Sequence, residues 1–457
     1  MQLPEVFLNS LEGTPGFDRT AFLLAHQVPS TYVSVRINPF KQPGTKLVFP
    51  NFSHITFENV PWSKYGYYLS ERPSFTFDPF FHAGLYYVQE ASSMFLEQAL
   101  TQLADLSQPL KILDLSAAPG GKATHIQSLI SNDSLLVANE VIKSRCAVLT
   151  DNIIKWGSGN VVITNNDPSA FKNLTGYFDV IVVDAPCSGS GLFRKDKEAI
   201  NEWSLNNVSL CSQRQQRILA DVMPALKDDG IMIYSTCSYS KEEDEAIGEW
   251  LVQEFEFKSE TLKIPSTWGI VESKSKHSTG YRFYPDKLKG EGFFLSCFRK
   301  QTTERETKFK PVSVEKASAT EKDLIRPWLR NGALELIRED GNLTAVSTAL
   351  LENYLQLKPV LKIFYKGTVI GQVMKNKLVP HHALAVSTLL LENAPSVEVA
   401  YEEAIKFLQR QELQIQPPTQ GWQIVRYKNQ GLGWINALPN RINNYYPKEM
   451  RILKQSL

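Results

Sequence analysis

Apolar runs that alternate with helical segments constrain this chain more than any other feature of its sequence. From Lys111 onward, apolar runs occur in KILDLS, LLVANE, VVITNND, FDVIVVDAP and GIMIYSTCS, with helix-like stretches between them. Strands that are apolar on both faces belong to a parallel sheet that helices cover on each side. The sequence therefore predicts an α/β fold with a doubly wound sheet.

The flanking regions predict further domains, since 457 residues are enough for two to four. We expect a mixed N-terminal region over 1–105, the α/β core over 106–300 and a polar linker over 301–320. The remaining residues, 321–457, are expected to form one or two small domains.

Local patterns predict several single elements. VSVRI (33–37) has the period of a strand, and the segment 84–100 has apolar residues at helical steps. GFFLSCFRK (292–300) predicts a last strand.

Two helix boundaries are also predicted. The helix that begins near Asn206 is expected to stop at Gly230, because glycine commonly follows the last helical turn. Ser240 and Glu243 have the spacing of a capping box, which predicts that a helix begins there.

Composition excludes several classes of protein. Lys plus Arg is 49 and Asp plus Glu is 48, which argues against a uniformly basic nucleic-acid coat but leaves room for a local basic surface. The five cysteines contain no C-x-x-C pair, so we expect neither a disulfide framework nor a bound metal. There is no signal-peptide pattern and no apolar run of about 18 residues, so we expect a cytoplasmic protein without a membrane span.

The strongest ligand-binding signal is the segment Asp114–Thr124, DLSAAPGGKAT, which joins a predicted strand to a helix. Its small residues let the backbone approach a ligand closely. Glu140, Asp167 and Asp184 end the next three strands, at the sheet edge where ligands of such folds bind. Glu140 is placed to hold ribose hydroxyls, and Asp167 to meet a base amine.

Three nucleotide ligands compete for this loop. A Walker A loop fails because Ser116 replaces its first glycine and Ala123 follows the lysine. The G-x-G-x-x-G fingerprint of dinucleotide sites is absent, which also argues against an NAD oxidoreductase. S-adenosylmethionine needs ribose and adenine contacts but no phosphate cradle, and it fits best.

Two cysteines follow neighbouring strands at the same sheet edge. Cys187 lies in Asp184-Ala-Pro-Cys-Ser-Gly189 and Cys237 in Ser235-Thr-Cys-Ser-Tyr239, so both sulfurs and Asp184 should converge beside the ligand loop. We interpret the other three cysteines as packing residues. Thiol–disulfide chemistry is the rival interpretation, although no C-x-x-C pair supports it.

Two thiols beside a methyl donor suit one reaction in particular. C5 of cytosine is a poor nucleophile until a thiolate adds to C6, and an acid such as Asp184 at N3 favours that addition. After methyl transfer, the C5 proton must leave and the thiol must be expelled, which a second cysteine can assist. The residues alone do not say which cysteine has which role.

These motifs resemble those of the Nop/Sun family of RNA cytosine-5 methyltransferases. Besides the three motifs above, Arg36-x-Asn38, His82-Ala-Gly84, Tyr87, Gln89-Glu90 and Ser92-Ser93 match motifs of this family. The resemblance covers about residues 30–300 and implies a Rossmann-like class I methyltransferase core. Ser116 departs from the family pattern, in which many members carry Cys.

The resemblance also implies roles for individual residues. Cys237 would be the nucleophile and Cys187 the residue needed for product release. The expected cofactor-binding set is Ser116, Ala117, Ala118, Pro119, Gly120, Gly121, Lys122, Glu140, Asp167 and Asp184.

The C-terminal end is similar to the RsmF-like subgroup, which modifies 16S ribosomal RNA and carries a small PUA-like RNA-binding region. Residues 421–457 contain six Lys and Arg against one acid, with five Trp and Tyr among them. Such residues suit phosphates and unstacked bases, but the aromatics suit the core of a small β domain equally well. The expected RNA contacts are Arg36, Asn38, Arg426, Lys428, Arg441 and Lys448.

The sequence thus predicts a monomeric methyltransferase that makes 5-methylcytosine in ribosomal RNA or the small ribosomal subunit. The same chemistry on transfer RNA remains an alternative. A catalytically silent RNA-binding assembly factor is a third, and the intact thiols and cofactor loop argue against it.

Overall fold

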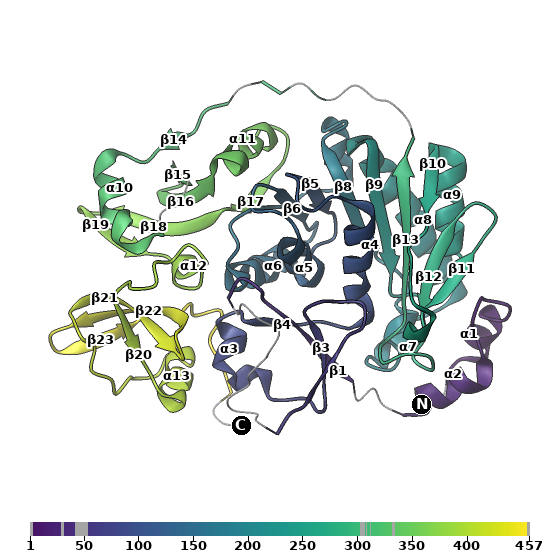
Figure 1. Cartoon of the computed structure of the whole chain (residues 1–457), viewed down its shortest axis with the longest axis horizontal. Helices are drawn as coiled ribbons and strands as arrows, with labels where there is room; N and C mark the ends of the chain where they lie inside the picture. The colour runs from purple at the N-terminus through teal and green to yellow at the C-terminus, as the bar shows by residue number, and fades with distance from the viewer. Residues whose placement is uncertain are drawn as a thin grey trace.

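The computed structural model describes residues 3–28, 32–41, 54–301, 307, 309–310, 312–330 and 334–454. Its centre is a ten-stranded sheet in the order β11-β12-β13-β9-β8-β5-β6-β7-β17, with β10 paired to β13 (Figure 1). The strands are β5 (Lys111–Asp114), β6 (Leu135–Asn139), β7 (Val161–Thr164), β8 (Phe178–Asp184), β9 (Leu226–Thr236), β10 (Phe257–Glu260), β11 (Val271–Lys274), β12 (Thr279–Phe283), β13 (Phe293–Lys300) and β17 (Ile363–Lys366).

Strands β5 to β9 are parallel, as the sequence predicts. Their residues are buried on both faces, which is typical of a parallel sheet covered by helices. One face packs against α4 (Leu96–Leu103), α5 (Gly121–Leu129) and α6 (Lys143–Trp156). The other face packs against α8 (Leu205–Val222), α9 (Glu245–Phe255) and α11 (Thr348–Leu357). This three-layer arrangement confirms the predicted Rossmann-like α/β core.

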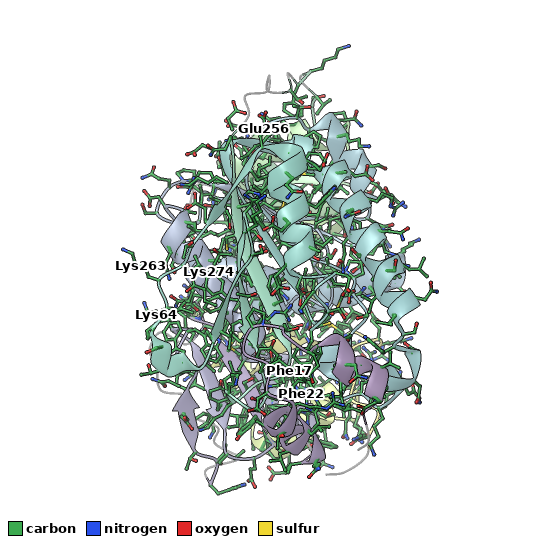
Figure 2. The ribbon with its side chains drawn as sticks, turned by 90° about the vertical axis from the view of Figure 1, so that its right-hand side faces the viewer. Phe17, Phe22, Lys64, Glu256, Lys263 and Lys274 are labelled. Carbon is green, nitrogen blue, oxygen red and sulfur yellow. The ribbon has the colours of Figure 1, made fainter. Side chains whose placement is uncertain are left out.

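The N-terminal region has its own antiparallel sheet, in the order β2-β3-β1-β4. Its elements are α1 (Glu5–Ser10), α2 (Arg19–Gln27), β1 (Val33–Ile37), β2 (Phe57–Asn59), β3 (Gly66–Leu69), α3 (Pro79–His82) and β4 (Tyr86–Val88). Phe17 and Phe22 make an edge contact with ring centroids 5.4 Å apart (Figure 2). Phe22 also packs on Tyr239, so α2 rests against the segment that carries Cys237.

Two further sheets lie in the C-terminal part of the chain (Figure 1). The first is formed by β14 (Glu315–Lys316), β15 (Leu334–Glu339), β16 (Asn342–Ser347), β18 (Thr368–Met374) and β19 (Lys377–Pro380). The second is formed by β20 (Ser396–Glu398), β21 (Gly421–Tyr427), β22 (Gln430–Leu438) and β23 (Arg441–Asn444). The helices here, besides α11, are α10 (Ala319–Ile325), α12 (His382–Ala385) and α13 (Tyr401–Leu408). Strand β17 instead joins the central sheet antiparallel to β7, so this region is continuous with the core.

Three local expectations need correction. The segment 84–100 is not one helix, because β4 and the 3-10 helix η2 (Ser92–Phe95) precede α4. Helix α8 ends at Val222, before Gly230, because Pro224 follows and the chain enters β9 at Leu226.

The predicted capping box is also absent, since α9 starts at Glu245 and its N-cap residue is Asp244.

The expected strands at 33–37 and 292–300 are confirmed as β1 and β13. Part of the predicted linker, at 302–306, 308 and 311, lies outside the described residues. None of the helices in the described part of the chain combines the length and the hydrophobicity that a membrane crossing requires.

Candidate active site

The loop between β5 and α5 forms one wall of a cavity of about 220 Å³ at the carboxyl edge of the sheet. Gly120 has a φ of 117°, a left-handed conformation that favours glycine. A Cβ on Gly121 would lie 3.5 Å from the ring of Tyr87 and narrow the cavity. The lining residues are Tyr87, Val88, Gln89, Glu90, Ser93, Ser116, Ala117, Ala118, Pro119, Gly121, Lys122 and Asp184. Six loop residues and Asp184 from the predicted set therefore face one space.

The other predicted cofactor residues, Gly120, Glu140 and Asp167, are not on the lining of this cavity. Glu140 is 2% exposed, and its Oε1 accepts a hydrogen bond from the amide of Ile142 at 2.9 Å. Its Oε2 accepts no hydrogen bond from the described residues, although Arg145 lies 3.3 Å away. Asp167 caps the 3-10 helix η3 (Pro168–Asn173) by accepting from Ser169. One oxygen of Glu140 is thus held by a backbone amide, and the other has the Arg145 guanidinium as its ion-pair partner.

Asp184 connects the cavity to the cysteine segments. The Lys122 ammonium lies 2.8 Å from Oδ2 of Asp184, and the Ser235 hydroxyl donates to Oδ1 at 2.8 Å. Strands β8 and β9 are in register at Asp184 and Ser235. Because Cys187 and Cys237 follow these two positions closely, the paired strands deliver both cysteines to the same edge.

The two sulfurs meet there. Cys187 Sγ and Cys237 Sγ are 3.0 Å apart, both residues are half-buried, and neither forms a disulfide. The hydrogen bond with Cys237, and then burial, raise the pKa of Cys187 well above that of an ordinary thiol. Either sulfur can be the donor in this contact, so the geometry brings the two thiols together without ordering their roles.

The other three cysteines have no place in this site. Cys146, Cys211 and Cys297 are buried, which confirms their interpretation as packing residues. Burial is the largest cause that raises the pKa of each, so all three remain protonated thiols.

A buried carboxylate that the sequence assigned to a helix cap braces the two cysteine segments instead. Glu243 is inaccessible to solvent and accepts hydrogen bonds from the amide and hydroxyl of Ser188, at 2.8 and 2.5 Å, and from the hydroxyl of Ser238 at 2.7 Å. These serines directly follow the two cysteines in the chain. Gln215 donates a longer bond of 3.3 Å. Glu243 therefore holds the segments that carry both sulfurs.

Arg36 and Asn38, predicted to contact RNA, are fully buried. The Arg36 guanidinium donates to Gln89, at 2.8 Å, and to the Thr124 hydroxyl, at 2.6 Å, and it lies over the Trp156 ring. The Asn38 amide donates to the backbone carbonyls of Gly84 and Trp156. As direct RNA contacts these two predictions are wrong, because both side chains are fully buried and their hydrogen bonds go to other residues of the protein.

The C-terminal residues divide between core and surface. Lys428, Arg441 and Lys448 are exposed, whereas Arg426 is half-buried and donates to the carbonyl of Glu392 at 2.9 Å. Among the aromatic residues, Tyr427, Trp434 and Tyr446 belong to the core. Trp422 and Tyr445 stay accessible to solvent, and their ring centroids are 4.5 Å apart. Burial confirms the β-domain core interpretation for Tyr427, Trp434 and Tyr446, while RNA contact by the exposed residues stays a prediction.

The Rossmann-like sheet has a ligand loop after its first parallel strand, an acid at the end of each of the next three strands, and two adjacent thiols, an arrangement typical of a class I methyltransferase. Comparison with known proteins agrees. Residues 101–299 match the family model of 16S rRNA methyltransferase RsmB/F. Residues 3–91 match the N-terminal domain of 16S rRNA methyltransferase RsmF, and residues 394–452 match the methyltransferase RsmF PUA domain.

Relatives that match most of the chain point to the same family. The chain is 31% identical to ribosomal RNA small subunit methyltransferase F of Aeromonas salmonicida, over 86% of this chain and 85% of that protein. It is 30% identical to the protein of the same name from Aliivibrio fischeri strain ATCC 700601 / ES114, over 98% and 97% of the two chains. The chain belongs to the RsmF family of 16S rRNA methyltransferases.

Solved structures resemble the core. A methyltransferase homologue from Pyrococcus horikoshii has a TM-score of 0.50 and 28% identity, covering 65% of this chain and all of that one. NSun6 from the same organism, solved with SFG, has a TM-score of 0.55 and 19% identity, covering 65% of this chain and 98% of the other.

Two features of the site were not predicted from the sequence: Glu243 as a brace, and the cavity residues of β4 and the turn after it. The Gln89-Glu90 and Ser92-Ser93 motifs were the available signal for the latter. For Glu243 no local signal exists, because its partners lie on two different segments.

Proposed function

We propose that this protein transfers a methyl group from S-adenosylmethionine to C5 of cytosine in 16S ribosomal RNA, through a covalent bond between Cys237 and C6. The observation that carries the proposal is the 3.0 Å approach of two free thiols beside Asp184 and its Lys122 partner. A thiol pair beside a methyl-donor site has no use in methylation of an oxygen or an exocyclic amine, whereas C5 methylation needs a nucleophile and a release group.

The residues of the cavity fit the proposed cofactor. S-adenosylmethionine supplies an electrophilic methyl group on a sulfonium. The loop from Ser116 to Lys122 would hold its amino-acid part, and Oε2 of Glu140, which accepts no hydrogen bond from the described residues, suits a ribose hydroxyl. We keep Asp167 as the proposed partner of the adenine amine. The NSun6 structure was solved with SFG, an analogue of S-adenosylmethionine, which supports this cofactor for a protein of the same fold.

The chain's own groups would divide the chemistry. The Cys237 thiolate would form a bond to C6, the C5–C6 π pair would shift to C4–C5, and the C4–N3 π pair would shift to N3. N3 would take a proton from Asp184, so this step requires Asp184 in its neutral form rather than as the ion-pair partner of Lys122. C5 would then form its bond to the methyl carbon as the methyl–sulfonium bond breaks and the cofactor leaves as a neutral thioether. N3 would later return its proton to Asp184. A base removes the C5 proton, the C5–C6 double bond re-forms, and Cys237 leaves as a thiol or thiolate. Cys187, as the protonated neighbour, would donate a proton to the departing sulfur.

The proposed RNA substrate rests on the relatives, which are named ribosomal RNA small subunit methyltransferases, and on the PUA match. Exposed Lys428, Arg441 and Lys448 supply cations for its phosphates. A monomer, a cytoplasmic location and the domain boundaries 1–105, 106–300, 301–320 and 321–457 remain predictions.

The test is methyl transfer from labelled S-adenosylmethionine to small-subunit ribosomal RNA, supplied naked and as assembled subunits, with transfer RNA in parallel. We expect the label in 5-methylcytidine after digestion to nucleosides, at cytosines that bisulfite sequencing locates in 16S RNA. Label in another nucleoside would contradict the C5 chemistry, and label in transfer RNA alone would contradict the substrate.

A further inference from the structure

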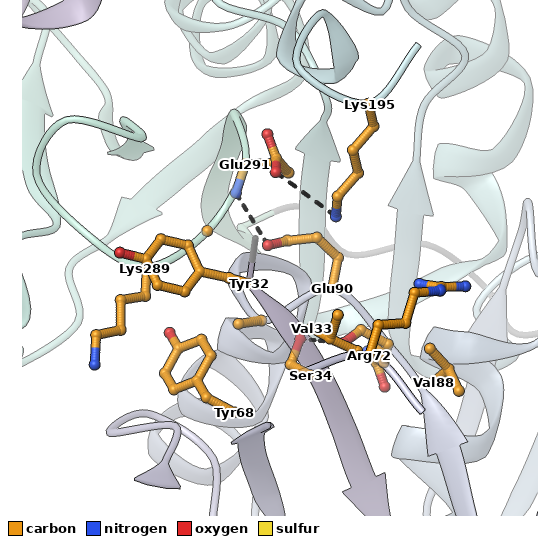
Figure 3. Close-up of a pocket in the computed structure, with 13 residues that line it drawn as sticks. Tyr32, Val33, Ser34, Tyr68, Arg72, Val88, Glu90, Lys195, Lys289 and Glu291 are labelled. Carbon is orange, nitrogen blue, oxygen red and sulfur yellow. Dashed lines mark hydrogen bonds and ion pairs between the residues drawn. The ribbon is translucent and has the colours of Figure 1, made fainter. Parts of the chain in front are cut away.

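A second cleft adjoins the cofactor cavity and is not used by the mechanism above (Figure 3). Val88, Gln89 and Glu90 line both spaces, so the two meet across the β4 segment. The enclosed part has a volume of about 70 Å³, enough for the edge of a nucleobase whose sugar and phosphate stay outside. Any ligand here would sit next to the methylation site.

The cleft contains a buried carboxylate with unused hydrogen-bonding capacity. Glu291 is 2% exposed, and neither of its side-chain oxygens accepts a hydrogen bond from any described residue. Lys195 and Arg194 approach them only to 3.8 and 3.9 Å, distances that compensate charge without forming hydrogen bonds. Leaving such an acceptor unpaired costs about 1–3 kcal/mol, so a donor that reaches the Glu291 oxygens from the cleft would relieve that cost.

The neighbouring acid is already occupied. Glu90 Oε1 accepts from the backbone amide of Glu291 at 3.0 Å (Figure 3). Oε2 of Glu90 accepts from the amide of Ser93 at 3.2 Å. Burial raises the pKa of Glu90, which favours its neutral form. Glu291 is therefore the side chain on the lining of this cleft with two free acceptor positions.

The rim has the other groups that a nucleotide requires. Arg72 and Lys195 are exposed, and the Lys289 ammonium lies 5.9 Å from the centre of the Tyr68 ring. Tyr32 is 41% exposed and contacts Tyr68 edge to face. Cations around aromatic faces suit a phosphate and a stacked base.

We propose that this cleft binds a guanine that flanks the target cytosine in the RNA, with Glu291 accepting from its N1–H and N2–H groups. Guanine has two parallel donors on one edge, which match two free carboxylate oxygens, whereas the corresponding edges of adenine, cytosine and uracil each offer one donor direction beside acceptors. The inference rests on the proposed function, since it concerns the RNA held at that site.

The test uses synthetic RNAs around a mapped target cytosine. Each of the two nucleotides on either side is changed to every other base and, where guanine is present, to inosine, which lacks the N2 amino group. We expect one position at which guanine raises kcat/KM by about 5–150-fold over other bases, the range for a bidentate contact, with an intermediate value for inosine. Absence of a guanine preference at all four positions overturns the inference without any variant protein.

Glu291→Gln assigns the preference to this residue. The variant should bind S-adenosylmethionine with unchanged affinity, which checks its fold, and should discriminate less than about threefold between guanine and the other bases. Lys289→Ala is the matched control, because loss of a rim cation should weaken every RNA equally and preserve the preference.

A guanine preference that survives in Glu291→Gln overturns the assignment. Failure of the unaltered enzyme to methylate any RNA would instead overturn the proposed function, and this inference with it. Methyl transfer without base preference overturns this inference alone.

Discussion

The thiol site and the exposed C-terminal cations use charge in opposite ways. Around Cys187 and Cys237, the acids are buried or bonded, with Glu243 holding Ser188 and Ser238 and with Asp184 joined to Lys122 and Ser235. On β21 to β23 and the segment after them, the C-terminal cations Lys428, Arg441 and Lys448 extend into solvent. A buried network fixes geometry, whereas exposed cations attract a polyanion over a distance. Substitutions in the first region should therefore affect kcat, and substitutions in the second should affect KM and salt dependence.

The largest effect is expected for Cys237→Ala. Removal of the nucleophile should lower methyl transfer by at least about 10³-fold, because C5 is then not activated. RNA affinity in a filter-binding assay should stay within about twofold, since binding depends on other residues. Methyl transfer above a tenth of the native rate would contradict the role of this cysteine.

The next effect concerns Glu243. Glu243→Ala removes the acceptor for both Ser188 and Ser238. The loss of these bonds should destabilise the arrangement of the two cysteine segments by about 3 kcal/mol. We therefore expect kcat to fall about 100-fold with little change in KM. Glu243→Gln keeps one acceptor oxygen and should recover part of the rate. A positioning role also predicts that Glu243→Ala slows formation of a Cys187–Cys237 disulfide under mild oxidant, measured by mass spectrometry. Native disulfide kinetics with a low kcat would exclude this role.

A smaller effect should appear in the pH dependence of stability. Burial raises the pKa of Asp114 from its ordinary value to about 7. An acid with a raised pKa in the folded state stabilises fully below its unfolded pKa of about 4, and that contribution is lost as the pH rises through about 7. From pH 5 to 7, the free energy of unfolding should fall by about 2–3 kcal/mol relative to Asp114→Asn, as urea unfolding can measure. A difference that stays constant with pH would refute the account of this buried acid.

The smallest effect is expected on the C-terminal surface. The triple variant Lys428→Ala, Arg441→Ala and Lys448→Ala should raise KM for RNA about tenfold and leave kcat unchanged. It should also reduce the slope of log affinity against log salt by about 2, since each lost phosphate contact contributes ~0.7–0.9. A drop in kcat instead would place this surface in the catalytic step and would remove the contrast between the two regions.

Patterns along the chain predicted the parts that depend on period and strand ends. Continuous apolar runs identified β5 to β9, and their shared edge predicted that Cys187 and Cys237 meet. Contacts between distant segments were not predictable in this way. Arg36 is buried because its partners at 89 and 124 satisfy its donors, and Glu243 bonds Ser188, 55 residues away, rather than a helix end. In both cases, hydrogen bonds to distant residues decide the role of the side chain, and the neighbouring sequence does not reveal them.

The most direct test of the account is the state of RNA bound to Cys187→Ala. If Cys237 forms the bond to C6 and Cys187 releases it, this variant should give an RNA–protein band that persists on a denaturing gel in the presence of S-adenosylmethionine. The band should be absent from Cys237→Ala and from the double variant. A denaturing gel without a band for Cys187→Ala, or with a band for Cys237→Ala, would contradict the assignment of the two thiols.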